Sequence, residues 1–413
     1  MKDRGGKQLM KKKKTTSDSG RIQVTVSEDE IQEYQQKNRK RMRRLPLPAV
    51  LLIIWVALYF GSLIFSVRVY LPGTGGEYYN RASWFMSSIQ QFIEHSYNLF
   101  FQAGPTGSVE MFYCQFLGVA LAGAALAACG AVFQGTFRNV LAGPSTMGVM
   151  SGGSMGCMVY LLIFWGNAGL NAVFSGFLQP LCTLAGCFGG VCLILLVSLA
   201  AGRGKVSSST MVIAGTVFSG IISNIMMVIQ YWIIANNPSD GRIEEMKRLM
   251  MGNFFQLTSL PMLAAMGIPI LICLGILLFC RGKMNLLAFG EEEAEAMGLN
   301  VRRYKNLMIL SGTILTAMVV SFCGRIGFIG FMVPLVMRRI TGPDMKKLLP
   351  AVIMAGAVFM TVIYDIACIF ALETSLSVIT GPLGCIVMII TLFRKGGGSD
   401  EAGKGATASG MGF

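Results

Sequence analysis

The residues best suited to act on another molecule lie in one charged segment, residues 281–305, which reads RGKMNLLAFGEEEAEAMGLNVRRYK. Gly290 can cap a short helix that opens with Glu291 and two further glutamates, because acidic side chains are favoured at the positive N-terminal end of a helix. Gly298 can end that helix in a left-handed turn. Asn300 can then cap the next helix, which carries several basic residues. The segment therefore predicts two capped helices rich in charge.

Apolar side chains stand among these charges, and they decide between two interpretations of the segment. An ordinary solvated loop between two membrane spans is the simpler one. Such a loop needs neither two capped helices nor a small apolar patch, so we favour a docking surface for a cytosolic partner. The residues expected to form this surface are Gly290, Glu291, Glu292, Ala294, Met297, Gly298 and Leu299.

No pattern elsewhere in the sequence predicts catalysis. Paired carboxylates and His/Cys clusters of the kind that catalytic or metal sites need are missing from the apolar stretches. No Gly-x-x-x-x-Gly-Lys-Ser/Thr run exists, since Lys205 is followed by Val206. The eleven cysteines form no CxxC pair and are interpreted as small buried hydrophobic residues. We therefore predict no enzyme, no catalytic residue, no metal site and no cofactor bound by this chain, so any ATP must be hydrolysed by another one.

The composition predicts an all-α polytopic membrane protein. Of the 413 residues 53% are hydrophobic and only 14% are charged, which is unusual for a soluble domain. About 20 apolar residues cross a bilayer as one helix. Ten such spans are predicted, the eighth of them short, at residues 48–67, 113–133, 145–165, 177–201, 209–235, 261–280, 307–323, 328–340, 351–372 and 376–393. Small residues that recur every four positions within them, such as Gly152 and Gly156, predict a closely packed bundle.

The distribution of charge predicts how the chain crosses the membrane. The net charge is +14, and basic residues crowd into residues 1–45 and a few short loops. By the positive-inside rule both termini lie in the cytosol. Nucleic acid is not an expected partner, because no aromatic residues alternate with these bases and no folded basic domain carries them. We predict a basic tail at 1–45, a ten-span domain at 46–395 in a bacterial cytoplasmic membrane, and a disordered tail at 396–413.

A polar turn joins the second and third predicted spans. Gln134 and Arg138 share one face of the expected helix, Asn139 and Pro144 then turn the chain, and Ser145 can cap the next span. Such a turn could simply anchor helix ends. Yet its sequence resembles the GAxxQGxxRNPLADPxxLGxxxGA signature of the FecCD-type family, the permease subunits of ABC importers for iron-siderophores, haem and cobalamin.

Three further segments resemble the same family, in the family's order. Residues 289–301 (FGEEEAEAMGLNV) are similar to LGEExAxxLGxxV, the segment that forms the coupling helices. Residues 324–339 (GRIGFIGFMVPLVMRR) are similar to GPIGFIGLxxPHxxR, and residues 373–382 (ETSLSVITGP) to ExPVGxxTAxxGxP. The motif after the seventh span contributes the candidate residues Gly324, Gly327, Gly330 and Pro334.

The resemblance implies a ten-span permease that pairs with a second copy or paralogue and with two cytosolic ATPase subunits, which bind ATP and Mg²⁺. An extracytoplasmic binding (lipo)protein would deliver the cargo. The fifth and tenth spans and residues 236–255 would line the pathway at the dimer interface. Polar residues within spans also hold helices together, so packing remains the alternative for these pathway candidates. They are Ser219, Ser223, Asn224, Gln230, Ser377 and Thr380.

Several positions depart from the family pattern and indicate a divergent member. Val140 and Arg325 stand where proline is usual, and Leu335 stands where histidine is usual. Residues 112–115 replace an Arg-Leu-Pro-Arg motif at which the binding protein docks. A secondary transporter of a small organic solute is the alternative function. It would predict charged residues at mid-membrane, and this sequence has almost none there.

Overall fold

The computed structural model describes residues 47–57, 107–165, 177–201, 208–236, 241–254, 257–369, 376–387 and 389. The predicted tails at 1–45 and 396–413 lie outside these residues, as do the end of the first predicted span and most of the segment that follows it. All contacts reported below lie within Leu51–Phe413, one of two compact units of the chain.

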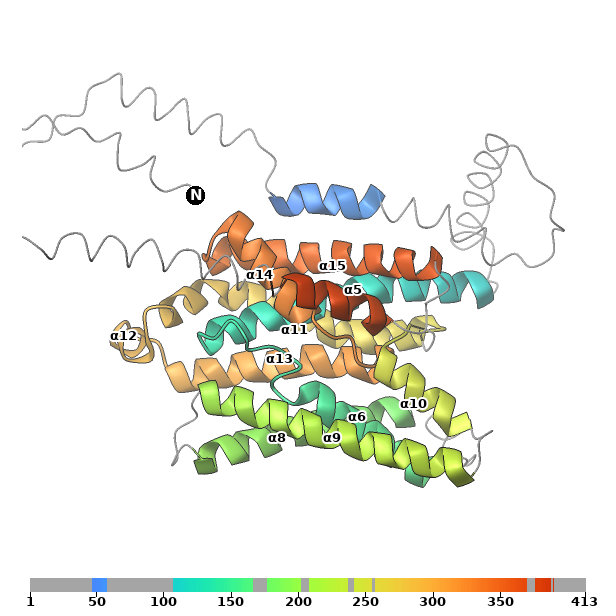
Figure 1. Ribbon diagram of the computed structural model, residues 1–413. Helices are drawn as coiled ribbons and strands as arrows, with labels where there is room; N and C mark the ends of the chain where they lie inside the picture. Colours follow the sequence, from blue (N-terminus) through green and yellow to red (C-terminus); the bar gives the residue numbers. More distant parts are fainter. Residues whose placement is uncertain are drawn as a thin grey trace, which may run out of the picture. The chain divides into compact units, whose positions relative to one another are not determined.

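The regular structure of the described residues is entirely helical, which confirms the predicted fold class for this part of the chain (Figure 1). The first and the last described helices along the sequence are short and apolar, at Leu47–Ala57 and Leu376–Val387. Between them lie α5 (Gly107–Thr136), α6 (Val149–Val159), the π-helical turn η1 (Tyr160–Phe164), α8 (Leu178–Ala201), α9 (Ser208–Asn236), α10 (Gly241–Met251), α11 (Leu260–Leu287), α12 (Glu291–Ala296), α13 (Val301–Cys323), α14 (Ile329–Thr341) and α15 (Met345–Ile369).

Six of the described helices are long and apolar enough to cross a membrane, namely α5, α8, α9, α11, α13 and α15. Each coincides with one of the ten predicted spans. The predicted spans at 145–165, 328–340 and 376–393 correspond to shorter helices, among them α14 with 13 residues. The predictions of about ten spans and of their orientation therefore stay predictions.

Two predicted helix boundaries are wrong for identifiable reasons. The apolar run after residue 260 ends at Cys280, but α11 continues to Leu287, because arginine and lysine are good helix formers that extend a helix beyond its apolar part. Ser145 does not cap the third span. That helix begins four residues later, after Gly148 with a φ of 71°, and the intervening residues form a turn.

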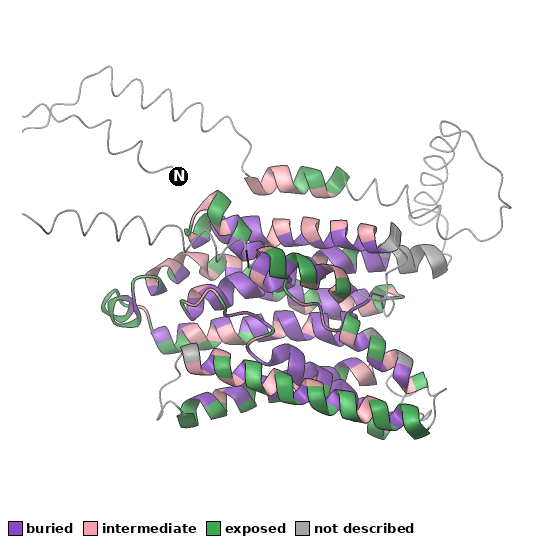
Figure 2. Cartoon of the chain, viewed as in Figure 1, coloured by how far each residue is buried: buried purple, intermediate pink, exposed green. Residues whose placement is uncertain are grey.

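Helix α5 lies at the centre of the bundle and packs against α11, α13, α14 and α15. Figure 2 shows the part of it from Cys114 to Thr136 almost wholly buried. Glycines bring backbones together on two of its sides, Gly123 against Gly356 of α15 and Gly130 against Gly330 of α14. A Cβ atom on Gly130 would overlap the Gly330 carbonyl. Small residues stabilise helix pairs in lipid through such close approach, so the predicted role of small residues in packing holds here.

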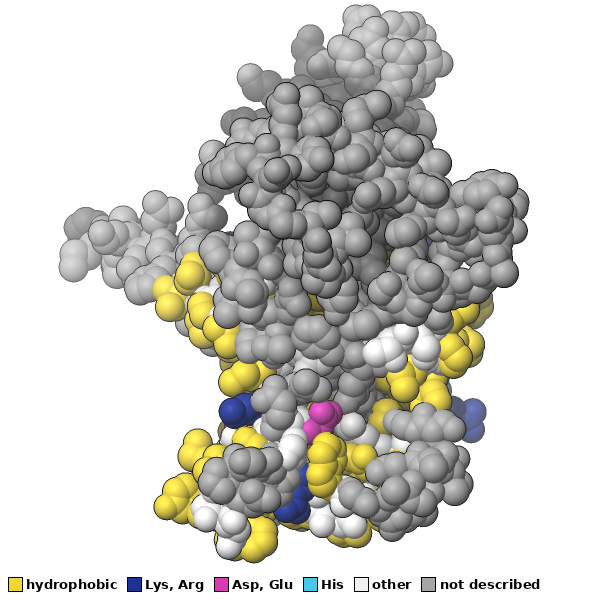
Figure 3. Space-filling view, turned by 90° about the vertical axis from the view of Figure 1, so that its right-hand side faces the viewer, with side chains coloured by type: hydrophobic (Ala, Val, Ile, Leu, Met, Phe, Trp, Pro, Cys, Tyr) yellow, Lys and Arg dark blue, Asp and Glu magenta, His cyan; other side chains and the backbone are white. Residues whose placement is uncertain are grey.

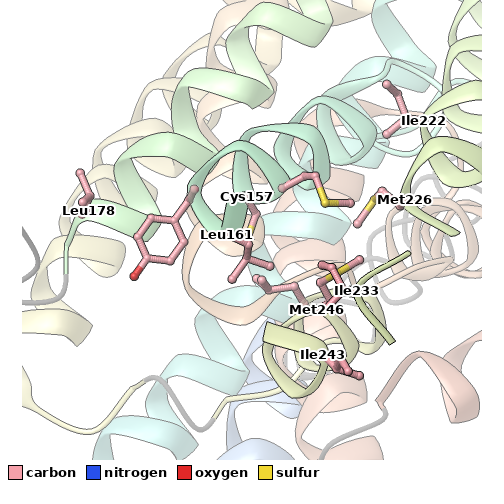
Figure 4. Close-up of a cluster of buried hydrophobic side chains, with 11 residues drawn as sticks. Cys157, Leu161, Leu178, Ile222, Met226, Ile233, Ile243 and Met246 are labelled. Carbon is pink, nitrogen blue, oxygen red and sulfur yellow. The ribbon is translucent and has the colours of Figure 1, made fainter. Parts of the chain in front are cut away.

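A second group of helices consists of α6, α8 and α9, with α6 and α8 packed through Gly152 and Gly186. The amphipathic helix α10 joins this group through the buried side chains of Ile243, Met246 and Leu249, which belong to one hydrophobic cluster with residues of α6, η1, α8 and α9 (Figure 4). The apolar face of α10 is thus part of the protein core.

The helices α10 and α12 lie at opposite ends of the bundle in Figure 1. At the α10 end, Gln179 of α8 donates a hydrogen bond of 3.1 Å to the carboxylate of Glu245. Figure 3 views this end, where the few described charged side chains stand among hydrophobic ones. The α12 end carries most of the described charge.

Candidate functional site

The caps predicted for residues 281–305 are present and shape the α12 end of the bundle. Gly290 precedes α12 with a φ of 144°, and three glutamates occupy the first turn. Gly298 follows the helix with a φ of 84°. The side chain of Asn300 accepts a hydrogen bond of 3.0 Å from the backbone N–H of Arg303 and so caps α13. Both capped helices are confirmed.

Contacts within the chain hold α12 in place. The ammonium of Lys305 pairs with the carboxylate of Glu291 at 2.5 Å, which joins α13 to α12. The Tyr304 hydroxyl donates to the Cys280 carbonyl at 2.8 Å, which joins α13 to α11. Ala294 lies on the inner side of α12 and is fully buried. Its carbonyl accepts a hydrogen bond from the Leu299 N–H. A six-residue helix would not hold its shape alone in water, so these contacts make it a fixed projection.

The outward side of this projection combines acid and apolar groups. The glutamates of the first turn are exposed, and so are Phe289 and Met297, at 69% and 50% of their surface. Exposed acids and large apolar side chains beside one another suit docking of a protein with a basic and apolar cleft. Of the seven predicted docking residues, Gly290 and Ala294 are buried and Leu299 is half-buried, while the other four are exposed.

The polar turn after α5 contacts the motif after α13. Buried Gln134 donates to the Phe331 carbonyl at 3.4 Å and accepts from the Arg338 guanidinium at 3.3 Å. The Pro144 ring packs on Gly330, where a Cβ atom would lie 2.8 Å from it. Two segments that the sequence singles out separately therefore form one structural unit.

Two details of this turn differ from the prediction. Gln134 and Arg138 do not share a helix face, because α5 ends at Thr136 and Arg138 adopts a φ of 50° in the turn. Asn139 does turn the chain as predicted. Its side chain accepts a 2.9 Å hydrogen bond from the Leu141 N–H, a local bond typical of asparagine in turns.

The motif after α13 connects α13, α10 and the last described helix. Gly324 ends α13 with a φ of 71°, and Gly327 lies half-buried in the turn before α14. The N–H of Arg325 donates to the Leu249 carbonyl at 2.9 Å, and its carbonyl accepts from the Ser377 hydroxyl at 2.7 Å. Pro334 is buried within α14.

The tentative pathway residues occupy different surroundings. On α9, Ser219 accepts a 2.5 Å hydrogen bond from Ser151 of α6, whereas Asn224 is exposed. The structure places Ser377 against the motif after α13, as described above, and Thr380 in the protein interior. The other two, Ser223 and Gln230, are half-buried on α9. These six residues are therefore not gathered in one described site.

Sequence reasoning missed three residues at the α12 end, namely Asn285, Arg338 and Asp344. Asn285 lies in the last turn of α11, which was expected to be a loop. Its side chain donates a hydrogen bond of 2.8 Å to Asp344. This bond and one from the Lys346 N–H hold the pKa of the Asp344 carboxyl below its ordinary value, because both stabilise the charged form.

Known proteins resemble the chain over most of its length. The model of the FecCD transport family matches residues 82–394. The vitamin B12 import system permease protein BtuC of Salmonella typhi is 32% identical over 286 residues, which cover 68% of this chain and 81% of that protein. The molybdate import system permease protein MolB of Haemophilus influenzae is 29% identical over 281 residues, which cover 68% of this chain and 79% of that protein.

Two further matches agree with these. The ABC transporter permease protein YvrB of Bacillus subtilis is 30% identical over 281 residues, covering 67% of this chain and 75% of that protein. The solved structure of an inward-facing metal-chelate type ABC transporter superposes with a TM-score of 0.63 at 24% identity, covering 84% of this chain and 98% of that one. The last likeness shows that the fold is shared.

Proposed function

Since the chain belongs to the FecCD transport family of ABC importer permeases, we propose that it carries an iron-siderophore, haem or cobalamin-like chelate across a bacterial cytoplasmic membrane. Similarity to a vitamin B12 permease supports a chelate as cargo. Similarity to a molybdate permease makes that oxyanion the competing candidate. The relatives reported above are ABC permeases, which argues against the alternative of a secondary transporter.

The proposed assembly contains further chains. ATP and Mg²⁺ would be bound by two cytosolic ATPase subunits, a second permease copy or paralogue would complete the pathway, and a binding (lipo)protein would deliver the cargo. The chain itself would cross the membrane about ten times with both termini in the cytosol. One observation carries this proposal furthest. The projection around α12 presents exposed Phe289 and Met297 beside glutamates, while Lys305 holds it against α13.

Replacement of the two exposed apolar residues tests the docking surface. We expect Phe289→Asp combined with Met297→Asp to abolish co-purification of the ATPase and leave the permease folded, because a charge in a desolvated contact is costly. Leu260→Asp is the matched control, since Leu260 is 61% exposed at the opposite end of α11. A double variant that still binds the ATPase and transports normally would show that α12 is not the docking surface.

A panel of probes tests the cargo. The full complex from the native operon, reconstituted in liposomes, would be supplied in turn with radiolabelled cyanocobalamin, ferrichrome, haemin and molybdate. We expect ATP-dependent uptake of one of the first three. Uptake of molybdate alone would overturn the proposal of a chelate, while the assignment to an ABC importer would stand.

A further inference from the structure

Asn285 connects the end of α11 to the start of α15 by two hydrogen bonds. Its Nδ2 donates to Oδ1 of Asp344 at 2.8 Å, and its Oδ1 accepts from the backbone N–H of Met345 at 2.9 Å. Donation to a carboxylate and acceptance from an N–H require both a donor and an acceptor on one short side chain. Asparagine offers both, whereas aspartate offers only acceptors.

The α15 side of this junction is equally well ordered. The same Oδ1 of Asp344 accepts from the Lys346 N–H at 3.0 Å, and the Asp344 carbonyl accepts from the N–H groups of Lys347 and Leu348. Asp344 is thus the N-cap of α15, where a negative charge is favoured. The first turn of α15 is therefore held by a residue of its own chain segment and by a residue of α11.

The junction lies between the docking projection and the core. The N–H of Ala288 donates to the Asn285 carbonyl at 3.3 Å where α11 ends, and α12 begins three residues later. The buried side chains of Met284 and Met345 both approach Gly135 of α5. Movement of α12 relative to the membrane would therefore reach this junction through the end of α11, and α13 through the pair of Glu291 and Lys305.

Beyond the junction, α15 cannot slide on α5 without moving it. The backbones of Gly123 and Gly356 are in direct contact, and a Cβ atom on Gly123 would overlap the Gly356 carbonyl. The atoms nearest to this contact are backbone atoms and the Cβ atoms of Ala127 and Met360, which stay in place when a side chain changes rotamer. Closely packed interfaces transmit displacements instead of absorbing them.

We propose that Asn285 and Asp344 form a clamp that passes the movement of the docked ATPase from α12 to α15 and α5. Both are positioning residues that touch neither ATP nor cargo. The clamp rests on the proposed function, since it needs an ATPase at α12. The competing explanation is that the two residues only cap a helix and contribute stability.

An exchange of the two side chains separates these explanations. Asn285→Asp alone sets two carboxylates against each other and removes the donor of the bond between them. Asp344→Asn alone keeps that bond, because the new amide oxygen can still accept from Asn285. The double variant Asn285→Asp/Asp344→Asn restores the bond between the two side chains with donor and acceptor reversed, and the new carboxylate at 285 still accepts from the Met345 N–H. It gives up the bond from the Lys346 N–H, because in the wild-type chain one oxygen of Asp344 accepts both bonds. The variants thus change the clamp in both directions with almost no change in volume.

The test uses the complex of permease, ATPase and binding protein in lipid nanodiscs. Three quantities are measured: the bound ATPase, the thermal midpoint, and the factor by which the binding protein raises ATP hydrolysis. We expect Asn285→Asp to retain the ATPase but to lower that factor by about fivefold or more, the lower end of typical coupling effects. Asp344→Asn should change it little, and the exchange should restore it.

The outcomes separate the clamp from the proposed function. If the wild-type chain retains no ATPase, the proposed function fails and the clamp fails with it. An unchanged stimulation factor in Asn285→Asp, while the wild-type complex responds to the binding protein, would overturn the clamp alone. So would a factor that falls only in step with the thermal midpoint, because a cap without a role in coupling predicts that result.

Discussion

Helices α5 and α9 are both long and apolar enough to cross a membrane, but the rest of the chain covers them to very different extents. In the most apolar stretch of Cys114–Thr136, 89% of the residues are buried, against 17% in that of Thr210–Asn236. Figure 2 shows the contrast along the two helices. Two helices of similar hydropathy are thus buried to very different extents within the chain.

The size of the side chains explains the difference. α5 presents glycines and alanines to its neighbours, so that other backbones can approach it from several sides. α9 presents large apolar side chains to the outside, including Met227, Val228 and Tyr231, which are 66%, 67% and 75% exposed. Lipid is as apolar as these side chains, so apolar character alone does not drive helices together in a membrane. The exposed face of α9 is where a second permease copy would be expected under the proposed function.

The largest expected effect comes from a methyl group added to the buried helix α5, compared with the same change in the exposed helix α9. Gly130→Ala in α5 should lower the thermal midpoint strongly, because the added atom meets backbone that cannot rotate away. Overpacking costs about 1–3 kcal/mol, and we expect the upper end. Gly220→Ala in α9 is the matched control, since no atom lies within 4 Å of the added one. Equal losses of thermal stability in detergent for the two variants would break the comparison.

A larger side chain on the exposed face of α9 is expected to weaken assembly of the complex. This effect is expected to be smaller than the loss of thermal stability in Gly130→Ala. Val228→Trp should weaken association of two permease copies and leave each copy folded, because a large ring disturbs a fitted interface. Leu196→Trp on α8 is the control, as Leu196 is 66% exposed and is expected to face lipid, which accommodates a ring. The mass of the solubilised complex, measured by light scattering, checks both variants.

Either of two results would contradict this expectation. Val228→Trp complexes of unchanged mass would place the α9 face against lipid. Dissociation of both variants alike would mean that the two faces do not differ, and the comparison between covered and uncovered helices would lose its functional meaning.

The sequence predicted local features better than contacts between distant segments. Gly290 and Asn300 behave as predicted, because a cap depends on the few residues around it. Asn285 was missed because the apolar run ends before it, although the helix does not. The bond between Gln134 and Arg338 joins residues 204 positions apart, and no local pattern announces it. The family motifs marked both segments without indicating that they touch.

Exposure of α9 was also beyond the reach of the sequence. Gly215, Ser219 and Ser223 recur every four residues along it, a spacing of small residues that predicts packing. Gly215 does pack, since an added Cβ would overlap the Thr146 carbonyl. The opposite side of the same helix stays uncovered within the described residues, because burial depends on which partners are present in space. The periodicity of a sequence predicts which residues share a face of a helix, but it does not predict which element packs against that face.

The smallest expected effect decides between packing and pathway for two serines one turn apart. Ser219 accepts from Ser151 and donates to the Ser145 carbonyl at 3.3 Å, so it fastens α9 to α6. Ser219→Ala should lower stability by about 0.6 kcal/mol, the average for such bonds in membranes, and leave transport unchanged. Ser223→Ala should leave stability unchanged and alter uptake if Ser223 lines the pathway. The thermal midpoint and the uptake are measured on both variants. The midpoint should fall only in Ser219→Ala, and uptake should change only in Ser223→Ala. A loss of uptake in Ser219→Ala at unchanged stability would reverse the assignment and place the pathway on the covered side of α9.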